Sequence, residues 1–148
     1  MSAELKIKPF AQLSREELYA ILKARVDVFV VEQQCPYPEL DGKDLSAVHF
    51  FRQDDGGQVL AYLRVFENRD GDMQIGRVLT TVRGKSYGRT LLHAAVAYLE
   101  ETSPQKQIVL ESQTYAVGFY EKEGFAVCSD EFMEDGIPHV KMVRKVSC

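Results

Sequence analysis

The chain has 148 residues, of which 45% are hydrophobic and 27% are charged. This length and composition predict one globular domain over residues 1–148. The formal net charge of −4 argues against general nucleic-acid binding, which requires a basic face. The N-terminus lacks the apolar core of a signal peptide, and no apolar run approaches the roughly 20 residues of a membrane helix. We therefore expect a cytoplasmic protein with no membrane and no nucleic-acid partner.

The residues that bind metals in other proteins are few and scattered here. Three cysteines, an odd number without C-x-x-C spacing, argue against a disulfide framework and a thiolate zinc site. The three histidines show no metal-ligand spacing, and H-E-x-x-H is absent. We expect no metal cofactor. The residues concerned are Cys35, Cys128, Cys148, His49, His93 and His139.

The first half of the chain predicts a strand, a helix and a three-stranded meander. Apolar and polar residues alternate over residues 5–10, as in a half-buried strand. Ser14 and Glu17 have the spacing of a capping box, and an apolar stripe continues the predicted helix to near Glu32. A proline- and acid-rich loop follows. Turns with Asp-Gly or Gly-Gly then separate three predicted antiparallel strands at about residues 48–52, 59–67 and 73–80.

The second half alternates helices and strands. A long helix is predicted over residues 87–101, and the apolar stretch "QIVLES" after it is typical of a buried central strand. A short helix over residues 115–123 ends at Gly124, and "FAVCSDEFM" and "HVKMVRKV" predict two last strands joined by "EDGIP". The order β-α-β-β-β-α-β-α-β-β predicts an α+β fold around one mixed sheet of six to seven strands, with about four helices.

The segment "RGKSYGR", residues 83–89, lies where a predicted strand passes into the long helix. Backbone N–H groups at a helix start are unpaired and carry partial positive charge. Glycines allow a ligand to approach the backbone closely, and three cations add full charges. This pattern predicts a site for a pyrophosphate or nucleotide phosphate. A tight turn with solvated basic residues is the alternative.

Two familiar phosphate-binding motifs do not fit this segment. A P-loop, G-x-x-x-x-G-K-[ST], requires glycine at position 79, where the chain has Leu79. The dinucleotide motif G-x-G-x-x-G is also absent, because Gly84 and Gly88 are too far apart to be its first pair.

The segment "RGKSYG" has the form [RQ]-x-x-G-x-[GA], with Ser86 in the place of the first motif glycine. Further along, "GFYEKEGF" has the form F-Y-x-x-x-G-F. Both resemble the signatures of the GNAT superfamily of acyl-CoA-dependent N-acyltransferases. The stretches "FVVEQQCPYPELDGKDL", "IGRV", "Q-x-x-x-x-x-FY" and "EDGIPH" resemble its ElaA-type branch. The matches follow one another in order over about residues 18–142.

The resemblance implies acetyl-CoA as co-substrate and a location for it. In the superfamily, the strand before the pyrophosphate loop diverges from its parallel neighbour, and the pantetheine arm lies in the gap. Backbone groups of that strand bind the arm and polarise the acyl oxygen. The cofactor-binding residues implied here are Val78, Leu79, Thr80, Arg83, Gly84, Lys85, Ser86, Tyr87, Gly88, Arg89 and Tyr120.

Tyr120 matches the family tyrosine that is assigned to protonate the leaving CoA sulfur, and a phenol has a suitable pKa for a thiolate leaving group. A structural role is the alternative. If Gly124 follows the short helix as its left-handed C′ residue, Tyr120 and Phe125 form the apolar pair of a Schellman ending.

The group that deprotonates the amine is left open by the sequence. Only about 0.1% of an alkylamine is neutral at pH 7, so proton removal matters. The catalytic candidates are Glu32 and His139 beside Tyr120, with Glu111 and a chain of waters as further alternatives. The candidates for binding the acceptor are Glu32, His49 and Gln113. A structural role is the alternative for His49.

These inferences together predict an N-acetyltransferase that transfers the acyl group of acetyl-CoA to a small or peptidyl primary amine by direct attack in a ternary complex. A non-catalytic acyl-CoA-binding module is the alternative, and a P-loop NTPase is a third hypothesis. Because members of the superfamily are commonly dimers, the resemblance also raises a homodimer as the oligomeric state to test.

Overall fold

The computed structural model describes residues 4–34 and 38–145, and every structural statement below concerns these residues. Cys35 and Cys148 of the disulfide argument lie outside them. Eight strands form one mixed sheet: β1 (Glu4–Pro9), β2 (Val48–Gln53), β3 (Val59–Glu67), β4 (Met73–Thr80), β5 (Ile108–Gln113), β6 (Ala126–Val127), β7 (Phe132–Glu134) and β8 (Ile137–Arg144). The three α-helices are α1 (Arg15–Arg25), α2 (Tyr87–Thr102) and α3 (Val117–Glu121).

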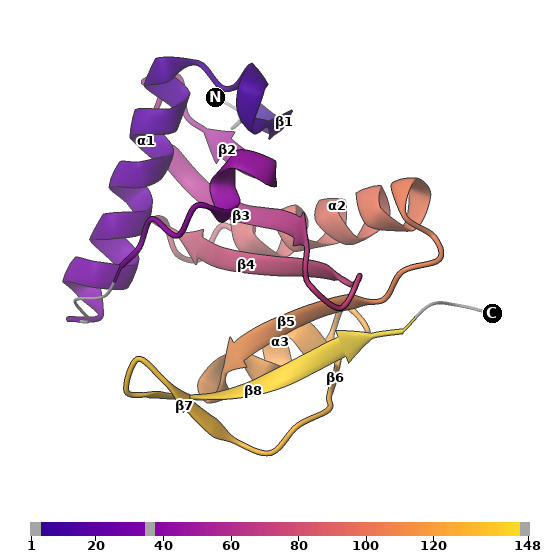
Figure 1. Cartoon of the computed structure of the whole chain (residues 1–148). Coiled ribbons are helices and arrows are strands. Elements are labelled where there is room, and N and C mark those ends of the chain that lie inside the picture. Colours follow the sequence, from indigo (N-terminus) through magenta and orange to yellow (C-terminus); the bar gives the residue numbers. More distant parts are fainter. Residues whose placement is uncertain (1–3, 35–37, 146–148) are drawn as a thin grey trace.

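The strand order in the sheet is β1-β2-β3-β4-β5-β8-β6, and β7 also pairs with β8 (Figure 1). Strands β2, β3 and β4 form the predicted antiparallel meander, and the N-terminal strand β1 pairs antiparallel with β2. The pair β4–β5 is parallel and is connected through α2, whereas β5 pairs antiparallel with β8. The observed order of elements confirms the predicted α+β fold with a mixed central sheet.

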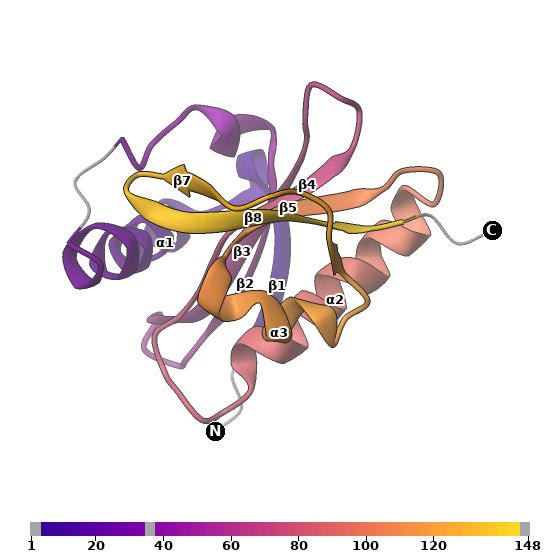
Figure 2. The ribbon, with the colours of Figure 1, turned by 90° about the horizontal axis from the view of Figure 1, so that it is seen from below.

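Helices cover both faces of the sheet (Figure 2). On one face, the long helix α2 packs Leu91, Leu92 and Leu99 against β2, β3 and β4 in the larger hydrophobic cluster. On the other face, α1 packs Ile21 and Ala24 against a smaller cluster. Strand β3 is buried along almost its whole length, because its alternate residues enter the two clusters. The sheet therefore lies between two hydrophobic cores. No helix among the described residues is long and apolar enough to cross a membrane.

The capping box predicted at the start of α1 is present. The backbone N–H of Glu17 donates to Ser14 Oγ at 3.0 Å, and the backbone N–H of Ser14 donates to Glu17 Oε1 at 2.9 Å. Burial disfavours the charged form of Glu17. The Ser14 N–H and the ammonium groups of Lys8 and Lys6 nevertheless lower its pKa to about 2. The carboxylate thus also ties α1 to β1.

Two predicted elements differ from the observed ones. The stretch "FAVCSDEFM" forms two short strands, β6 and β7, so the sheet has eight strands within the described residues and not six to seven. Between β6 and β7, the hydroxyl of Ser129 accepts a hydrogen bond from the backbone N–H of Lys141 at 2.8 Å, which interrupts the ladder with β8. The predicted first helix changes at Val26 into a π-helical segment, Val26–Glu32, which continues α1 to the predicted end.

Candidate active site

Strands β4 and β5 run side by side only at their beginnings. The pairs are Met73 with Ile108, Gln74 with Val109 and Ile75 with Leu110. Past these pairs the two strands separate, so the main-chain groups of β4 that face β5 have no strand partner within the described sheet. Figure 1 shows both strands diverging toward the end of α1 and the β7–β8 hairpin. This confirms the divergent strand pair that the superfamily resemblance implies.

A β-bulge lies where the separation begins. Tyr62 of β3 is opposite Leu79, but Arg64 is opposite Gly76, so β4 has one more residue than β3 between these pairs. Arg77 inside the bulge has a φ of 54°, a left-handed conformation that is uncommon for a residue with a Cβ. Because a bulge bends its strand, it provides a local cause for the turn of β4 away from β5.

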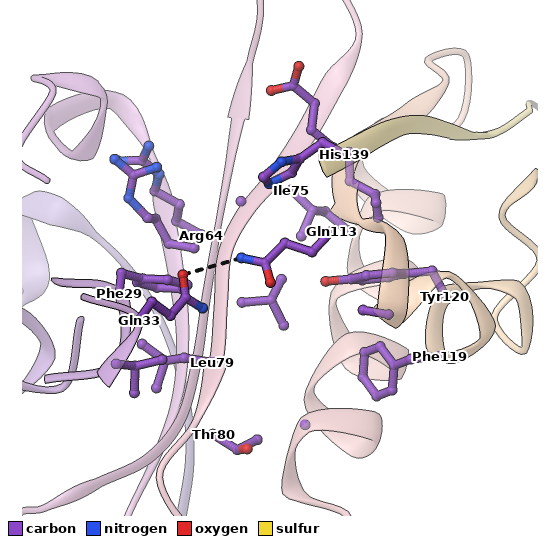
Figure 3. A pocket seen from close by; sticks show the side chains of 18 of the residues that line it. Phe29, Gln33, Arg64, Ile75, Leu79, Thr80, Gln113, Phe119, Tyr120 and His139 are labelled. Atoms are coloured by element: carbon purple, nitrogen blue, oxygen red, sulfur yellow. Dashed lines mark hydrogen bonds between the residues drawn. The ribbon is translucent and has the colours of Figure 1, made fainter. Parts of the chain in front are cut away.

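The divergence opens a cleft of about 820 Å³ (Figure 3). One wall carries Phe29 of the π-helical segment and Leu79 of β4, and the facing wall carries Phe119 and Tyr120 of α3. Most of the residues predicted from the sequence line it: Glu32, Val78, Leu79, Thr80, Arg83, Gly84, Ser86, Tyr87, Gly88, Arg89, Gln113, Tyr120 and His139. Lys85 and His49 do not line the cleft.

The N-terminus of α2 closes one end of the cleft. Gly88 lies in its first turn, where a Cβ would come within 2.9 Å of the methyl group of Thr80 on β4. Glycine therefore allows α2 to start directly against the end of β4. Ser86 at the N-cap provides no side-chain cap, which leaves the first backbone N–H groups of α2 available to an anion.

Ser86 has φ 59° and ψ 21°, so the place of the first motif glycine does require a left-handed conformation. That conformation costs a residue with a Cβ roughly 1–2 kcal/mol. We expect Ser86→Gly to raise the free energy of unfolding by about 0.5–1 kcal/mol, because the relief of strain exceeds the added chain entropy of glycine. Urea denaturation measures it.

The neighbouring Lys85→Gly variant is the control for this prediction. Lys85 is not among the residues with positive φ, so glycine there adds chain entropy without relieving strain. It is expected to be neutral or destabilising. If both glycine variants changed stability by the same amount, the left-handed strain at Ser86 would be refuted.

Arg83 and Glu32 contact each other across the mouth of the cleft. An Nη2 of Arg83 donates to Glu32 Oε1 at 3.0 Å, and the arginine side chain is 82% exposed. An exposed pair of this kind contributes little to stability, since water screens it. The guanidinium can therefore exchange this carboxylate for a phosphate at low cost.

Tyr120 lies near the end of α3, which ends in the predicted Schellman motif. The N–H of Phe125 donates to Tyr120 O at 3.3 Å, and the N–H of Gly124 donates to Glu121 O at 3.0 Å. Gly124 has a φ of 89°, and the rings of Tyr120 and Phe125 are in edge contact at 6.2 Å. The structural role considered for Tyr120 is thus present.

The Tyr120 hydroxyl is nevertheless directed into the cleft (Figure 3). The residue is only 8% exposed, and burial, with a smaller contribution from Tyr115, raises the pKa of the phenol above its usual value. The phenol therefore stays protonated over the ordinary pH range and can serve as a hydrogen-bond donor. Packing of the ring and chemistry at the hydroxyl are compatible.

His139 lies on β8 at the opposite end of the cleft from α2. Its Nδ1–H donates to Ile137 O at 2.7 Å, which in the neutral ring leaves Nε2 free to accept a proton. Phe132 stacks on the imidazole at 6.0 Å. Sequence reasoning explained the neighbouring Asp135-Gly136 as a hairpin turn, and both residues have positive φ, as a type I′ turn requires.

Two further residues of the cleft were missed from the sequence. Glu134 is on β7, and its Oε2 lies 3.6 Å from His139 Nε2. Burial and then the charge of Glu111 raise the pKa of Glu134. Gln33 accepts a hydrogen bond from Gln113 Nε2 at 3.3 Å (Figure 3). The hairpin turn was the available signal for Glu134, because a two-residue loop places it beside the strand that carries His139.

The structure places His49, which was predicted to bind the acceptor, in the interior and not in the cleft. Its side chain is 1% exposed, and both ring nitrogens have protein partners. Nε2–H donates to Asp44 O at 3.0 Å, and the Tyr62 hydroxyl donates to Nδ1 at 2.6 Å. Burial lowers the pKa of His49, so the ring is neutral. The structural alternative holds for this residue.

Comparison with known proteins agrees with this geometry. The sequence pattern of the family described as "Acetyltransferase (GNAT) domain" matches residues 12–146. The chain is 43% identical to the UPF0039 protein C11D3.02c of Schizosaccharomyces pombe over 142 residues, which cover 94% of this chain and 95% of that relative.

Two solved structures are similar over nearly their whole length. An acyl-CoA N-acyltransferase from Pseudomonas aeruginosa has a TM-score of 0.90 and 38% identity, with 97% of this chain and 99% of that chain covered. Escherichia coli ElaA has a TM-score of 0.91 and 33% identity, with coverages of 97% and 100%.

The sheet splits between β4 and β5, and a helix N-terminus lies at one end of the gap. Together with the family match, this arrangement defines the class of protein. The chain belongs to the GNAT acetyltransferase family. Its similarity to ElaA in sequence and structure places it in the ElaA-type branch of that family. These findings support an acyltransferase that uses an acyl-CoA.

Proposed function

We propose that the protein is an acetyl-CoA-dependent N-acetyltransferase that acylates a primary amine by direct attack in a ternary complex. The observation that carries the proposal is the cleft itself. It joins a stretch of β4 that has no β5 partner in the described sheet, the uncapped N-terminus of α2 and the inward-directed Tyr120 hydroxyl in one cavity. A thioester donor needs these three features together, and a plain anion site needs only the second.

The donor would lie along β4 with its diphosphate at the start of α2. N–H groups of Tyr87, Gly88 and Arg89 and the side chains of Arg83 and Arg89 would hold the phosphates. Backbone groups of Val78 and Leu79 would bind the pantetheine arm and the acyl oxygen, and Thr80 lies beside them. The thioester sulfur would then face Tyr120, which donates its proton as the sulfur leaves.

The acceptor amine would enter at the His139 end of the cleft, where Glu134, Glu111 and Gln113 also lie. The fixed ring orientation leaves His139 Nε2 able to take the ammonium proton before attack, so we assign His139 as the base. Glu32 is a weaker candidate, because its contact with Arg83 places it beside the phosphate-binding segment. The carboxylates at this end suit a cationic acceptor. The cytoplasmic location and the homodimer stay predictions.

Binding and turnover test the proposal separately. CoA is expected to raise the melting temperature in proportion to the logarithm of its concentration, whereas ATP at equal concentrations is expected to do so far less. A panel of primary amines is then screened for release of free thiol from acetyl-CoA. CoA binding without acceptor-dependent thiol release would favour the non-catalytic module. Protection by ATP and not by CoA would overturn the proposal.

The phosphate end has its own test. We expect the double variant Arg83→Ala, Arg89→Ala to weaken CoA binding about 10-fold or more, because two charge-assisted contacts are lost. Binding of pantetheine, which lacks the nucleotide and diphosphate, should change little. Arg69→Ala is the control, because this cation lies in the β3–β4 turn outside the cleft. Equal weakening of CoA and pantetheine would place the phosphates elsewhere. Isothermal calorimetry measures each constant.

A further inference from the structure

Three arginines and three carboxylates form a closed ring of alternating charge at the cleft, which Asp41, Arg64 and Arg77 line. Each carboxylate bridges two guanidinium groups, and each guanidinium bridges two carboxylates. The contacts are Arg25 Nε–Glu39 Oε2 at 2.6 Å, Glu39 Oε2–Arg77 Nε at 2.8 Å, Arg77 Nη2–Asp41 Oδ2 at 3.4 Å, Asp41 Oδ2–Arg64 Nη2 at 2.6 Å, Arg64 Nη1–Asp44 Oδ1 at 2.9 Å and Asp44 Oδ1–Arg25 Nη1 at 2.7 Å.

The ring is neutral as a whole and largely removed from solvent. Arg25, Glu39, Asp44 and Arg64 are buried, and the side chains of Asp41 and Arg77 are only partly exposed, where they line the cleft. Burial disfavours the charge on Asp44, but hydrogen bonds from Arg25 and Arg64 lower its pKa below its usual value. The ring therefore stays ionised while it holds its members in fixed positions.

The ring connects α1 with three parts of the molecule that line the cleft. Arg25 is the last residue of α1, Arg64 lies on β3, and the three carboxylates come from the segment between residues 39 and 44. Arg77 is the member on β4 and is the bulge residue with a φ of 54°. Its guanidinium also donates to the backbone carbonyl of Glu39 at 3.0 Å. The side chain of the strained residue is thus fixed at two points of the same segment.

The bulge determines where the next backbone groups of β4 lie. Val78 and Leu79 follow Arg77 directly, and beyond Ile75 the side of β4 that faces β5 has no strand partner in the described sheet. The antiparallel ladder to β3 holds only the other side. Without a second restraint, the left-handed residue can relax, since that conformation costs about 1–2 kcal/mol. The ring supplies that restraint through the side chain of Arg77.

We propose that Arg77 is a positioning residue for acyl transfer. Through the side chain of Arg77, the charge ring holds the β4 bulge. The backbone at Val78 and Leu79 is thereby placed to polarise the acyl oxygen. This inference rests on the proposed function. A ring that served only stability would lower the melting temperature on mutation and leave the polarisation of a bound thioester unchanged. The two roles are therefore separable by a measurement on the thioester carbonyl.

The test uses the full chain with acetyl-CoA labelled with ¹³C at the acyl carbonyl. Isotope-edited infrared spectroscopy gives the carbonyl stretching frequency of the bound thioester, which falls when hydrogen bonds polarise the carbonyl. In Arg77→Met, we expect the frequency to return more than halfway toward that of free acetyl-CoA. The Kd from calorimetry should change less than about threefold, because the phosphate contacts are intact. With a responsive amine, kcat should fall about 10-fold or more at nearly constant KM for acetyl-CoA.

Arg144→Met is the matched control. Arg144 lies on β8, forms an ion pair with Glu100 at 3.0 Å and donates to Glu123 O at 3.0 Å, with a side-chain exposure of 26% against 19% for Arg77. It lies outside the cleft, so the carbonyl frequency in this variant should equal that of the wild type. A change as large as that in Arg77→Met would overturn the inference.

Arg77→Gly keeps the test valid if methionine impairs folding. Glycine adopts the left-handed conformation without strain, so the chain is expected to fold. Glycine also adopts many other conformations, so without the guanidinium the bulge is no longer held in one geometry and carbonyl polarisation is still expected to fall. A wild-type frequency in either Arg77 variant overturns the inference and leaves the proposed function intact. Absence of calorimetric binding of acetyl-CoA to the wild type overturns the proposed function, and the inference falls with it.

Discussion

Tyr120→Phe is expected to lower kcat about 100-fold while the Kd for acetyl-CoA changes less than about twofold. Loss of a general acid typically reduces a rate by 10²–10⁴, and phenylalanine retains the ring contacts with Phe119 and Phe125. The substitution thus removes the hydroxyl that is directed into the cleft and little else. Steady-state kinetics with an amine found by the screen, together with calorimetry, separate the two constants.

The pH dependence adds a second readout for the same residue. Because burial raises the pKa of Tyr120, the phenol keeps its proton up to about pH 10, the usual pKa of tyrosine. Wild-type kcat should therefore show no decline from loss of this proton between pH 7 and pH 10. Tyr98→Phe is the control, because Tyr98 packs against Phe50 outside the cleft. An unchanged kcat in Tyr120→Phe would mean that Tyr120 has only a structural role, in the packing of its ring at the end of α3.

The parts of the fold that were predicted correctly depend on neighbours in sequence. The capping box at Ser14 and Glu17, the left-handed Gly124 and the turn at Asp135 and Gly136 each involve residues within five positions of one another. The physical rules for such short segments are local, so the sequence contains the needed information. The bounds of β2, β3, β4 and α2 were also close to prediction, since their apolar patterns are long.

The parts that were missed depend on residues far apart in sequence. The acids between residues 39 and 44 were assigned to a loop, and nothing local indicates that their partners are Arg25, Arg64 and Arg77, which are up to 38 residues away. The same applies to His49, whose burial depends on Tyr62 of the next strand. Such pairs become visible only when the sheet register is known.

The candidate site shows the same division. The start of α2 was predicted as an anion site from local chemistry, and its residues line the cleft, apart from Lys85. The sequence showed that Ser86 takes the place of the first motif glycine, but its left-handed φ became known only from the structure. Glu134 was missed, because its contact with His139 forms only where β7 pairs with β8 across the Asp135-Gly136 turn. Of the residues predicted to bind the acceptor, Glu32 and Gln113 line the cleft, whereas His49 does not.

Arg25→Met is expected to lower the free energy of unfolding by about 3–5 kcal/mol at pH 7. The change leaves Glu39 and Asp44 buried with one guanidinium fewer, and uncompensated buried charges have costs of this size. Methionine retains much of the apolar stem of arginine, so the packing of α1 changes little. Urea denaturation measures the loss, and Arg15→Met, an exposed position of the same helix, should stay within about 0.5 kcal/mol of the wild type.

The pH dependence of this loss distinguishes charge from packing. Arg25 and Arg64 lower the folded-state pKa of Asp44, so the stabilisation from its ionisation is complete above the unfolded pKa of about 3.9 and is lost as the pH falls through the folded value. In Arg25→Met, Asp44 is protonated at a higher pH than in the wild type, which relieves the unpaired charge. The difference in stability between the two proteins should therefore shrink below about pH 4. If the difference in the free energy of unfolding were equal at pH 7 and pH 3, Arg25 would stabilise α1 by packing, and the charges of the ring would not account for the effect.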